Sequence, residues 1–158
     1  MSQREPSYQL NVSRIFTAPP QAVYRAFVSP GLLAEWLAPA GWSVQPEQVE
    51  IDARPGGRLR YTVTSMRDPA RRIVTSAVFE EVEAGRLLAW SAEVRPEPSA
   101  LETAGAVRVE LFDQPGGTTR LELRAGPYTE AGEIEAREFW NLASGRLDVV
   151  LEHLSSGV

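Results

Sequence analysis

Residues 51–63 read IDARPGGRLRYTV, and this stretch decides which class of fold the chain is assigned to. Its Pro55-Gly56-Gly57 segment has two interpretations: a glycine loop that binds a phosphate, or a turn between two strands. A phosphate loop needs a helix directly behind the glycines. Here Leu59, Tyr61 and Val63 alternate with polar residues instead, and a period of two is typical of a half-buried strand. The stretch therefore predicts a β-hairpin.

The same strand signals recur on both sides of this hairpin, with short turn-forming segments between them. A first strand is predicted over residues 8–16, and the later runs cover residues 49–53, 59–65, 73–82, 87–94, 107–112 and 121–124. Short spacers favour antiparallel hairpins over crossover connections. The middle of the chain is therefore predicted to form an antiparallel sheet.

Helical signals lie before and after these strands. Pro19 and Pro20 suit a helix start, because proline is tolerated in the first turn, and residues 29–31 separate this helix from a second short one over residues 32–37. From about residue 130 to residue 154 the apolar residues follow helical spacing and fill a broad arc. An arc that wide needs a concave partner, which a curved sheet wrapped around one long C-terminal helix supplies.

Composition excludes several classes of function. The 158 residues carry a formal net charge of −5 and are 43% hydrophobic, which fits one domain with a sizeable core. The negative charge argues against binding to nucleic acid or to an anionic membrane surface. There is no cysteine, which excludes thiolate zinc sites and a cysteine nucleophile. No apolar run has the length of a signal core or a membrane span.

From these observations we expect a single domain over residues 1–158 in the cytoplasm, with no metal and no cofactor, as a monomer or a homodimer. His153 is the only histidine in the sequence, which makes hydrolase triads and transition-metal centres poor interpretations. Near a helix end it is expected to be a cap or a packed polar residue.

Arg146 is the polar residue that the helical pattern singles out. It falls inside the apolar arc of the long helix, where an unpaired guanidinium is costly. Two interpretations stay open: Arg146 forks to a carboxylate or similar anion on a ligand, or it pairs with a sheet carboxylate or reaches the surface. Aromatic rings form much of the wall of an apolar pocket, and the predicted cavity residues are Trp36, Tyr61, Phe79, Trp90, Phe139, Trp140, Ala143, Arg146 and Val150.

Several short motifs occur in an order that resembles a known family. FTAP at residues 16–19 is followed by VYRAF at 23–27, LAEWLAP at 33–39, DARPGG at 52–57, FEEVEAGRL at 79–87 with Trp90, and GTTRL at 117–121. Together these motifs resemble the activator of Hsp90 ATPase homologue-like (AHSA1-like) branch of the START-like, or SRPBCC, superfamily. The resemblance covers nearly the whole chain.

The resemblance implies an α+β helix-grip (START-like, Bet v 1-like) fold, in which a curved antiparallel sheet and a long C-terminal helix enclose an apolar cavity. It does not imply one activity, because members bind lipids or polyketides, carry out cyclase or hydrolase chemistry, or assist a chaperone. We expect non-catalytic binding of a small apolar or amphipathic ligand. The alternatives are a protein-interaction role like that of an Hsp90 co-chaperone and a cyclase- or hydrolase-type enzyme.

Overall fold

The computed structural model describes residues 8–92 and 105–156. Strand β1 (Tyr8–Phe16) is followed by two short helices, α1 (Pro20–Val28) and α2 (Pro30–Trp36). The long helix α3 (Glu130–Ser156) ends the described chain. Between α2 and α3 lie the remaining strands, β2 (Trp42–Ile51), β3 (Arg58–Ser65), β4 (Arg72–Glu83), β5 (Leu87–Ala92), β6 (Ala106–Gln114) and β7 (Thr118–Tyr128).

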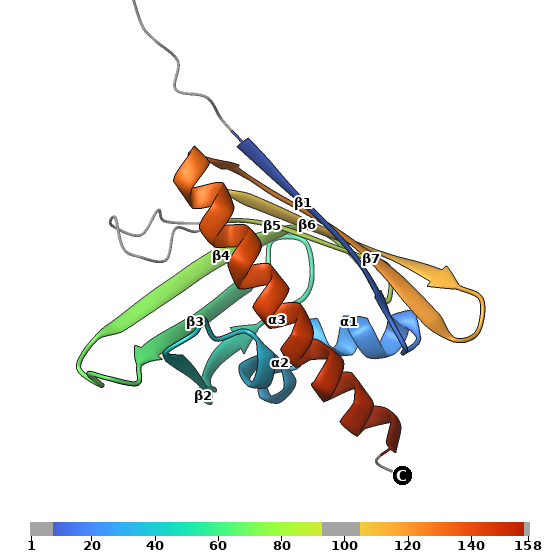
Figure 1. The fold of residues 1–158 in the computed structure, drawn as a ribbon, viewed down its shortest axis with the longest axis horizontal. Helices are drawn as coiled ribbons and strands as arrows, with labels where there is room; N and C mark the ends of the chain where they lie inside the picture. Colours follow the sequence, from blue (N-terminus) through green and yellow to red (C-terminus); the bar gives the residue numbers. More distant parts are fainter. Residues whose placement is uncertain (1–7, 93–104, 157–158) are drawn as a thin grey trace, which may run out of the picture.

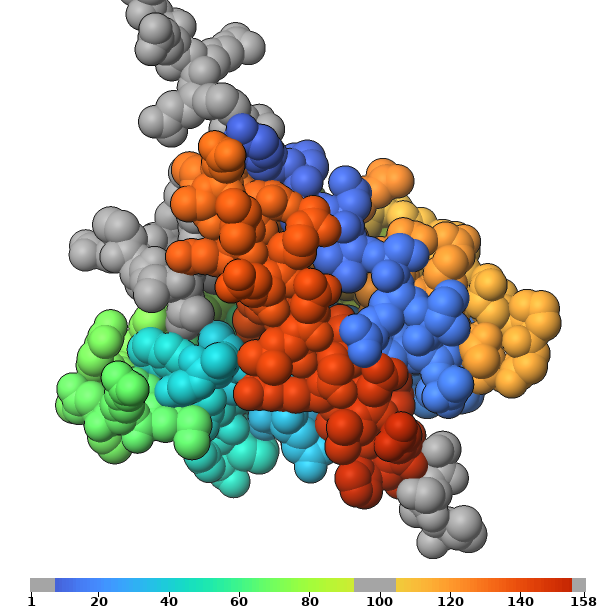
Figure 2. All heavy atoms as spheres, in the orientation of Figure 1, coloured from blue at the N-terminus to red at the C-terminus, as the bar shows by residue number. Residues whose placement is uncertain are grey.

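The described strands form one seven-stranded antiparallel sheet in the order β1-β7-β6-β5-β4-β3-β2. α3 runs diagonally across the sheet, and α1 and α2 lie beside its C-terminal half (Figure 1). The space-filling view shows α3 crossing the whole face of the molecule, between β1 on one side and the strands near β2 on the other (Figure 2). This arrangement confirms the predicted α+β helix-grip fold.

Two strands differ in extent from their predictions. β2 was predicted over residues 49–53 but begins at Trp42, and its pairing with β3 is interrupted between Val44 and Val49. Pro46 lies in this interval and has no N–H to donate to a ladder, which hides the strand from a pattern search. β7 was predicted over residues 121–124 but runs from Thr118 to Tyr128. The end of the predicted strand 87–94 lies outside the described residues.

The Pro55-Gly56-Gly57 segment is the turn of the β2–β3 hairpin, as predicted. The Gly56 N–H donates to the Phe79 carbonyl oxygen at 2.8 Å, and the Phe79 N–H donates to the Gly57 carbonyl oxygen at 2.9 Å. The Gly57 N–H donates to the Arg54 carbonyl oxygen at 2.8 Å. Both glycine N–H groups are therefore bound within the protein, and the turn is joined to β4 by main-chain hydrogen bonds.

The C-terminal half of α3 is the part of the helix most deeply packed. Leu147 is 1% exposed, and Leu151 is equally part of the core. On the β1 side the Arg14 guanidinium donates to the Asp148 carboxylate at 2.6 Å, which fixes the helix to the first strand. No helix within residues 8–92 and 105–156 is long and apolar enough to cross a membrane.

The short helices form a compact support for this half of α3. Pro20 is the first residue of α1, in the position where its missing N–H costs no hydrogen bond. The Trp36 indole N–H donates to the Ala26 carbonyl oxygen at 3.0 Å. The ring of Phe27 meets that of Trp36 edge to face, with centroids 4.8 Å apart. α1 and α2 are therefore held together by contacts of their own that do not involve α3.

We predict that Gly57→Ala destabilises the protein more than Gly56→Ala. A Cβ at residue 57 would lie far inside contact distance of the Asp52 carbonyl oxygen, which belongs to the main chain and cannot rotate away. At residue 56 there is open space, and only the left-handed φ of 84° strains a side chain. We expect losses in unfolding free energy of about 3 kcal/mol and about 1 kcal/mol respectively, measured by denaturant titration.

Gly31→Ala is the matched control, because a Cβ there meets nothing and the residue lies in α2 at an ordinary φ. It is expected to be neutral or to stabilise by up to about 1 kcal/mol. A Gly57→Ala variant as stable as this control would contradict the proposed steric requirement.

Leu147→Ala is expected to lower the unfolding free energy by roughly 2 to 5 kcal/mol, because the truncation leaves a cavity at a fully buried side chain. Val149, on the same helix, is 51% exposed, so Val149→Ala should change stability by less than about 0.5 kcal/mol. Equal effects of the two substitutions would be incompatible with the observed rotation of α3.

Candidate functional site

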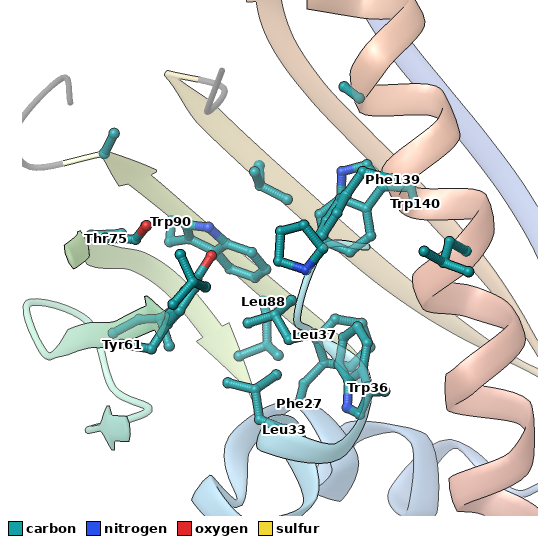
Figure 3. Close-up of a pocket in the computed structure, with 18 of the residues that line it drawn as sticks. Phe27, Leu33, Trp36, Leu37, Tyr61, Thr75, Leu88, Trp90, Phe139 and Trp140 are labelled. Atoms are coloured by element: carbon teal, nitrogen blue, oxygen red, sulfur yellow. The ribbon is translucent and has the colours of Figure 1, made fainter. Parts of the chain in front are cut away.

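A pocket of about 410 Å³ lies between the N-terminal half of α3 and the sheet (Figure 3). This volume is in the range of small-molecule sites. Its helical side is formed by Glu135, Ala136, Glu138, Phe139, Trp140 and Leu142. The other walls come from Phe27, Leu33, Trp36, Leu37, Pro39 and Ala40, and from the strand residues Leu59, Tyr61, Val63, Thr75, Ser76, Ala77, Phe79, Leu88, Trp90, Ala92, Val107 and Tyr128.

The period-two pattern of β3 supplies part of the sheet wall. Leu59, Tyr61 and Val63 all line the pocket, while Arg58 and Arg60, which alternate with them along the strand, are exposed on the opposite face. The alternation that identified the hairpin in the sequence therefore also identifies three pocket residues.

Tyr61 forms the main polar group of the sheet wall. It lies directly opposite Thr75 in the β3–β4 pairing. Burial raises the pKa of the Tyr61 hydroxyl, and the neighbouring Thr75 hydroxyl lowers that pKa by a smaller amount. The phenol is therefore neutral at physiological pH and acts as a hydrogen-bonding group within a mostly apolar wall.

Aromatic side chains face one another across the pocket (Figure 3). On the sheet side the rings of Phe79 and Trp90 meet edge to face, with centroids 6.1 Å apart and planes at 79°. On the helix side Phe139 and Trp140 meet in the same way at 5.1 Å. Such contacts hold the rings in defined orientations, so both walls are shaped before any ligand arrives.

Two carboxylates line the pocket from the first turns of α3. Glu135 and Glu138 are both exposed, and neither forms an ion pair with a residue that the structure describes. Glu133, on the same helix, differs because it pairs with Arg137 at 2.5 Å. In the described part of the chain no three carboxylate or histidine side chains come close enough together to hold a metal ion.

The structure brings together most of the residues that the sequence singled out. Trp36, Tyr61, Phe79, Trp90, Phe139 and Trp140 lie in the pocket lining. The pocket lining does not include Ala143, Arg146 and Val150, and their predicted place in it is corrected here.

The correction has a physical cause in the length of the helix. Arg146 lies two turns beyond Phe139, about 10 Å further along the axis, beside Ala38 in the segment after α2. There the Arg146 Nη1 donates to the Ala38 carbonyl oxygen. Ala143 is 1% exposed and Val150 is also buried, in the core rather than in the pocket wall.

His153 lies near the end of α3 and interacts with the main chain of its own helix, as expected for a cap or a packed polar residue. Its Nδ1 lies 2.9 Å from the Val149 carbonyl oxygen, one turn earlier on α3. It does not line the pocket.

Several polar lining residues were missed in the sequence, among them Thr75, Ser76, Glu135 and Glu138. Thr75 is identified only through its register opposite Tyr61, which depends on the length of the turn between β3 and β4. Glu135 and Glu138 lie one turn and one residue before Phe139, so a search one turn upstream of a predicted cavity aromatic would have found them.

Comparisons with known proteins agree with this geometry. The model of the family described as "Activator of Hsp90 ATPase homolog 1-like protein" matches residues 17–152. A crystal structure of a protein from Chromobacterium violaceum is similar, with 23% identity over 91% of this chain and 96% of that chain, at a TM-score of 0.78.

A protein from Rhodobacter sphaeroides has 26% identity over 92% of this chain and 93% of that one, with a TM-score of 0.74. An AHSA1-like protein from Aeromonas hydrophila has 19% identity over 94% of each chain, with a TM-score of 0.73. The comparison with curated proteins finds no match.

We predict that Arg146→Met affects stability rather than the pocket. The substitution keeps the apolar stem and removes the hydrogen bond to the Ala38 carbonyl, so the unfolding free energy should fall by about 1 to 2 kcal/mol. Uptake of N-phenyl-1-naphthylamine, an uncharged fluorescent probe, should change by less than about twofold, because Arg146 does not line the pocket. A large loss of probe uptake in a folded variant would restore Arg146 as a ligand-binding residue.

Proposed function

This chain belongs to the activator of Hsp90 ATPase homolog 1-like family, and we propose that it binds a small apolar or amphipathic molecule in the pocket beneath α3. The observation that carries the proposal is a pocket of about 410 Å³ whose walls are mostly aromatic and aliphatic side chains. Burial of an apolar ligand against such walls is favourable in proportion to the area removed from water.

Two further features support a binding role. The rings that form the walls are held by edge-to-face contacts on both sides of the pocket, which limits the conformational entropy lost when a ligand binds. The Tyr61–Thr75 pair offers a hydrogen-bonding group inside the apolar surface, and a few placed polar groups of this kind fix the orientation of a ligand.

The alternative functions need features other than these. A cyclase or hydrolase needs a base or acid that exchanges a proton near neutral pH. The raised pKa of the Tyr61 hydroxyl opposes that role, and Glu135 and Glu138, the carboxylates of the lining, are exposed to solvent. A protein-interaction role like that of a chaperone activator depends on an outer contact surface and does not require a pocket of this size. We therefore propose binding without chemistry.

Native mass spectrometry of freshly purified protein tests the proposal directly. We expect a fraction of the protein to carry a retained small molecule, released on denaturation, or to take up N-phenyl-1-naphthylamine with an increase in its fluorescence. Protein that retains nothing and takes up no uncharged apolar probe would contradict the proposed function.

The Ala136→Trp variant should abolish most of this uptake. Ala136 lies in the pocket lining on α3, so the indole would occupy the space of the ligand, and we expect probe affinity to fall by about tenfold or more. Ala131→Trp is the matched control, because Ala131 is exposed on the same helix and does not line the pocket. Thermal unfolding of both variants checks that they fold, and equal probe affinities would contradict binding in this pocket.

A further inference from the structure

The arrangement of polar groups around the pocket specifies the charge of its ligand, an inference that rests on the proposed function. We propose that the pocket selects an aromatic or polycyclic apolar molecule with a hydroxyl or carbonyl oxygen at the sheet end and a protonated amine at the helix end. It discriminates against carboxylates of the same size.

The sheet end is a neutral hydrogen-bonding site. A phenol offers one donor and two acceptor positions. Tyr61 lies in the lining opposite Thr75, so the two hydroxyls together can bind a ligand oxygen. Figure 3 shows Tyr61, Thr75 and Trp90 grouped on this side of the pocket, facing Phe139 and Trp140.

The helix end is negative and rich in π-electrons. Glu135 and Glu138 line the pocket beside Phe139 and Trp140, and neither carboxylate is neutralised by a cation of the described residues. A ligand cation here gains attraction from the carboxylates and from the faces of the aromatic rings. A ligand carboxylate in the same position would be repelled by both.

Arg146, which the sequence suggested as the partner of an acidic ligand, does not contact the pocket. Arg146 donates to the Ala38 carbonyl oxygen and lies outside the lining. Among the described lining residues, Glu135 and Glu138 are the only charged side chains. The electrostatic preference is therefore opposite to the one that a cavity arginine would give.

A matched ligand series separates charge from shape. The probes are naphthalenes with a hydroxyl at position 6 and an aminomethyl, hydroxymethyl or carboxylate group at position 2, and their dissociation constants are measured by isothermal titration calorimetry at pH 7. At low ionic strength we expect the amine to bind about five- to tenfold more tightly than the acid, with the alcohol between them. Added salt should reduce this difference.

Two double variants locate the source of the preference. Glu135→Gln with Glu138→Gln should bring the three probes to within about twofold of each other. Glu47→Gln with Glu50→Gln makes the same change in net charge at exposed positions of β2, outside the lining, and should leave the preference intact. Tyr61→Phe should weaken all three probes by a similar factor and keep their order, because it removes only the hydrogen bond at the sheet end.

The outcomes distinguish this inference from the proposed function. If the alcohol binds but the acid binds as tightly as the amine, or if the preference persists without Glu135 and Glu138, the inference is wrong and the binding function stands. If none of the three probes binds although N-phenyl-1-naphthylamine does, the inference is wrong and the binding function stands. If N-phenyl-1-naphthylamine is not taken up either, the proposed function fails and the inference with it.

Discussion

The broad apolar arc of α3 is the constraint on which the rest of the structure depends. A helix with this much apolar surface cannot be covered by one flat layer, so the sheet curves around it and the two short helices cover what the sheet does not reach. α1 and α2 lie beside the C-terminal half (Figure 1). The pocket lies between the N-terminal half and the sheet, and Phe27, Leu33 and Trp36 of the short helices close one side of it. The pocket therefore lies where the sheet and the short helices leave part of α3 uncovered.

The hairpin that identified the fold also shapes the site. Gly56 and Gly57 exchange main-chain hydrogen bonds with Phe79 on β4, and the Phe79 ring contacts Trp90 across the pocket wall. The backbone of a wall residue is thus fixed by a turn that is itself specified by lack of space at Gly57. The conformation of the turn at Gly57 and the position of the Phe79 ring in the pocket wall therefore depend on the same contacts.

The sequence predicted the parts of this protein that depend on periodicity. Alternation on β3 identified Tyr61 and the face it shares, and helical spacing identified the buried side of α3 around Leu147. The sequence patterns did not predict features that depend on position along the axis of α3 or on the register between strands. A helical projection discards position along the axis, so Arg146 was placed in the pocket with Phe139, although it lies about two turns further along α3 and donates to the Ala38 carbonyl oxygen instead. Thr75 was missed because it depends on register, and the pattern of a single strand does not contain register.

The interruption in β2 has a consequence for how copies of the protein meet one another. β2 is an edge strand of the sheet, and an unpaired edge rich in apolar residues is a template for aggregation. Between Val44 and Val49 the strand leaves its register, and residues 45–47, which include Pro46 and Glu47, are exposed there. A missing donor and a charge on this edge oppose the addition of a further strand, so the feature that hid β2 from the sequence pattern also disfavours edge-to-edge pairing between two copies of the domain.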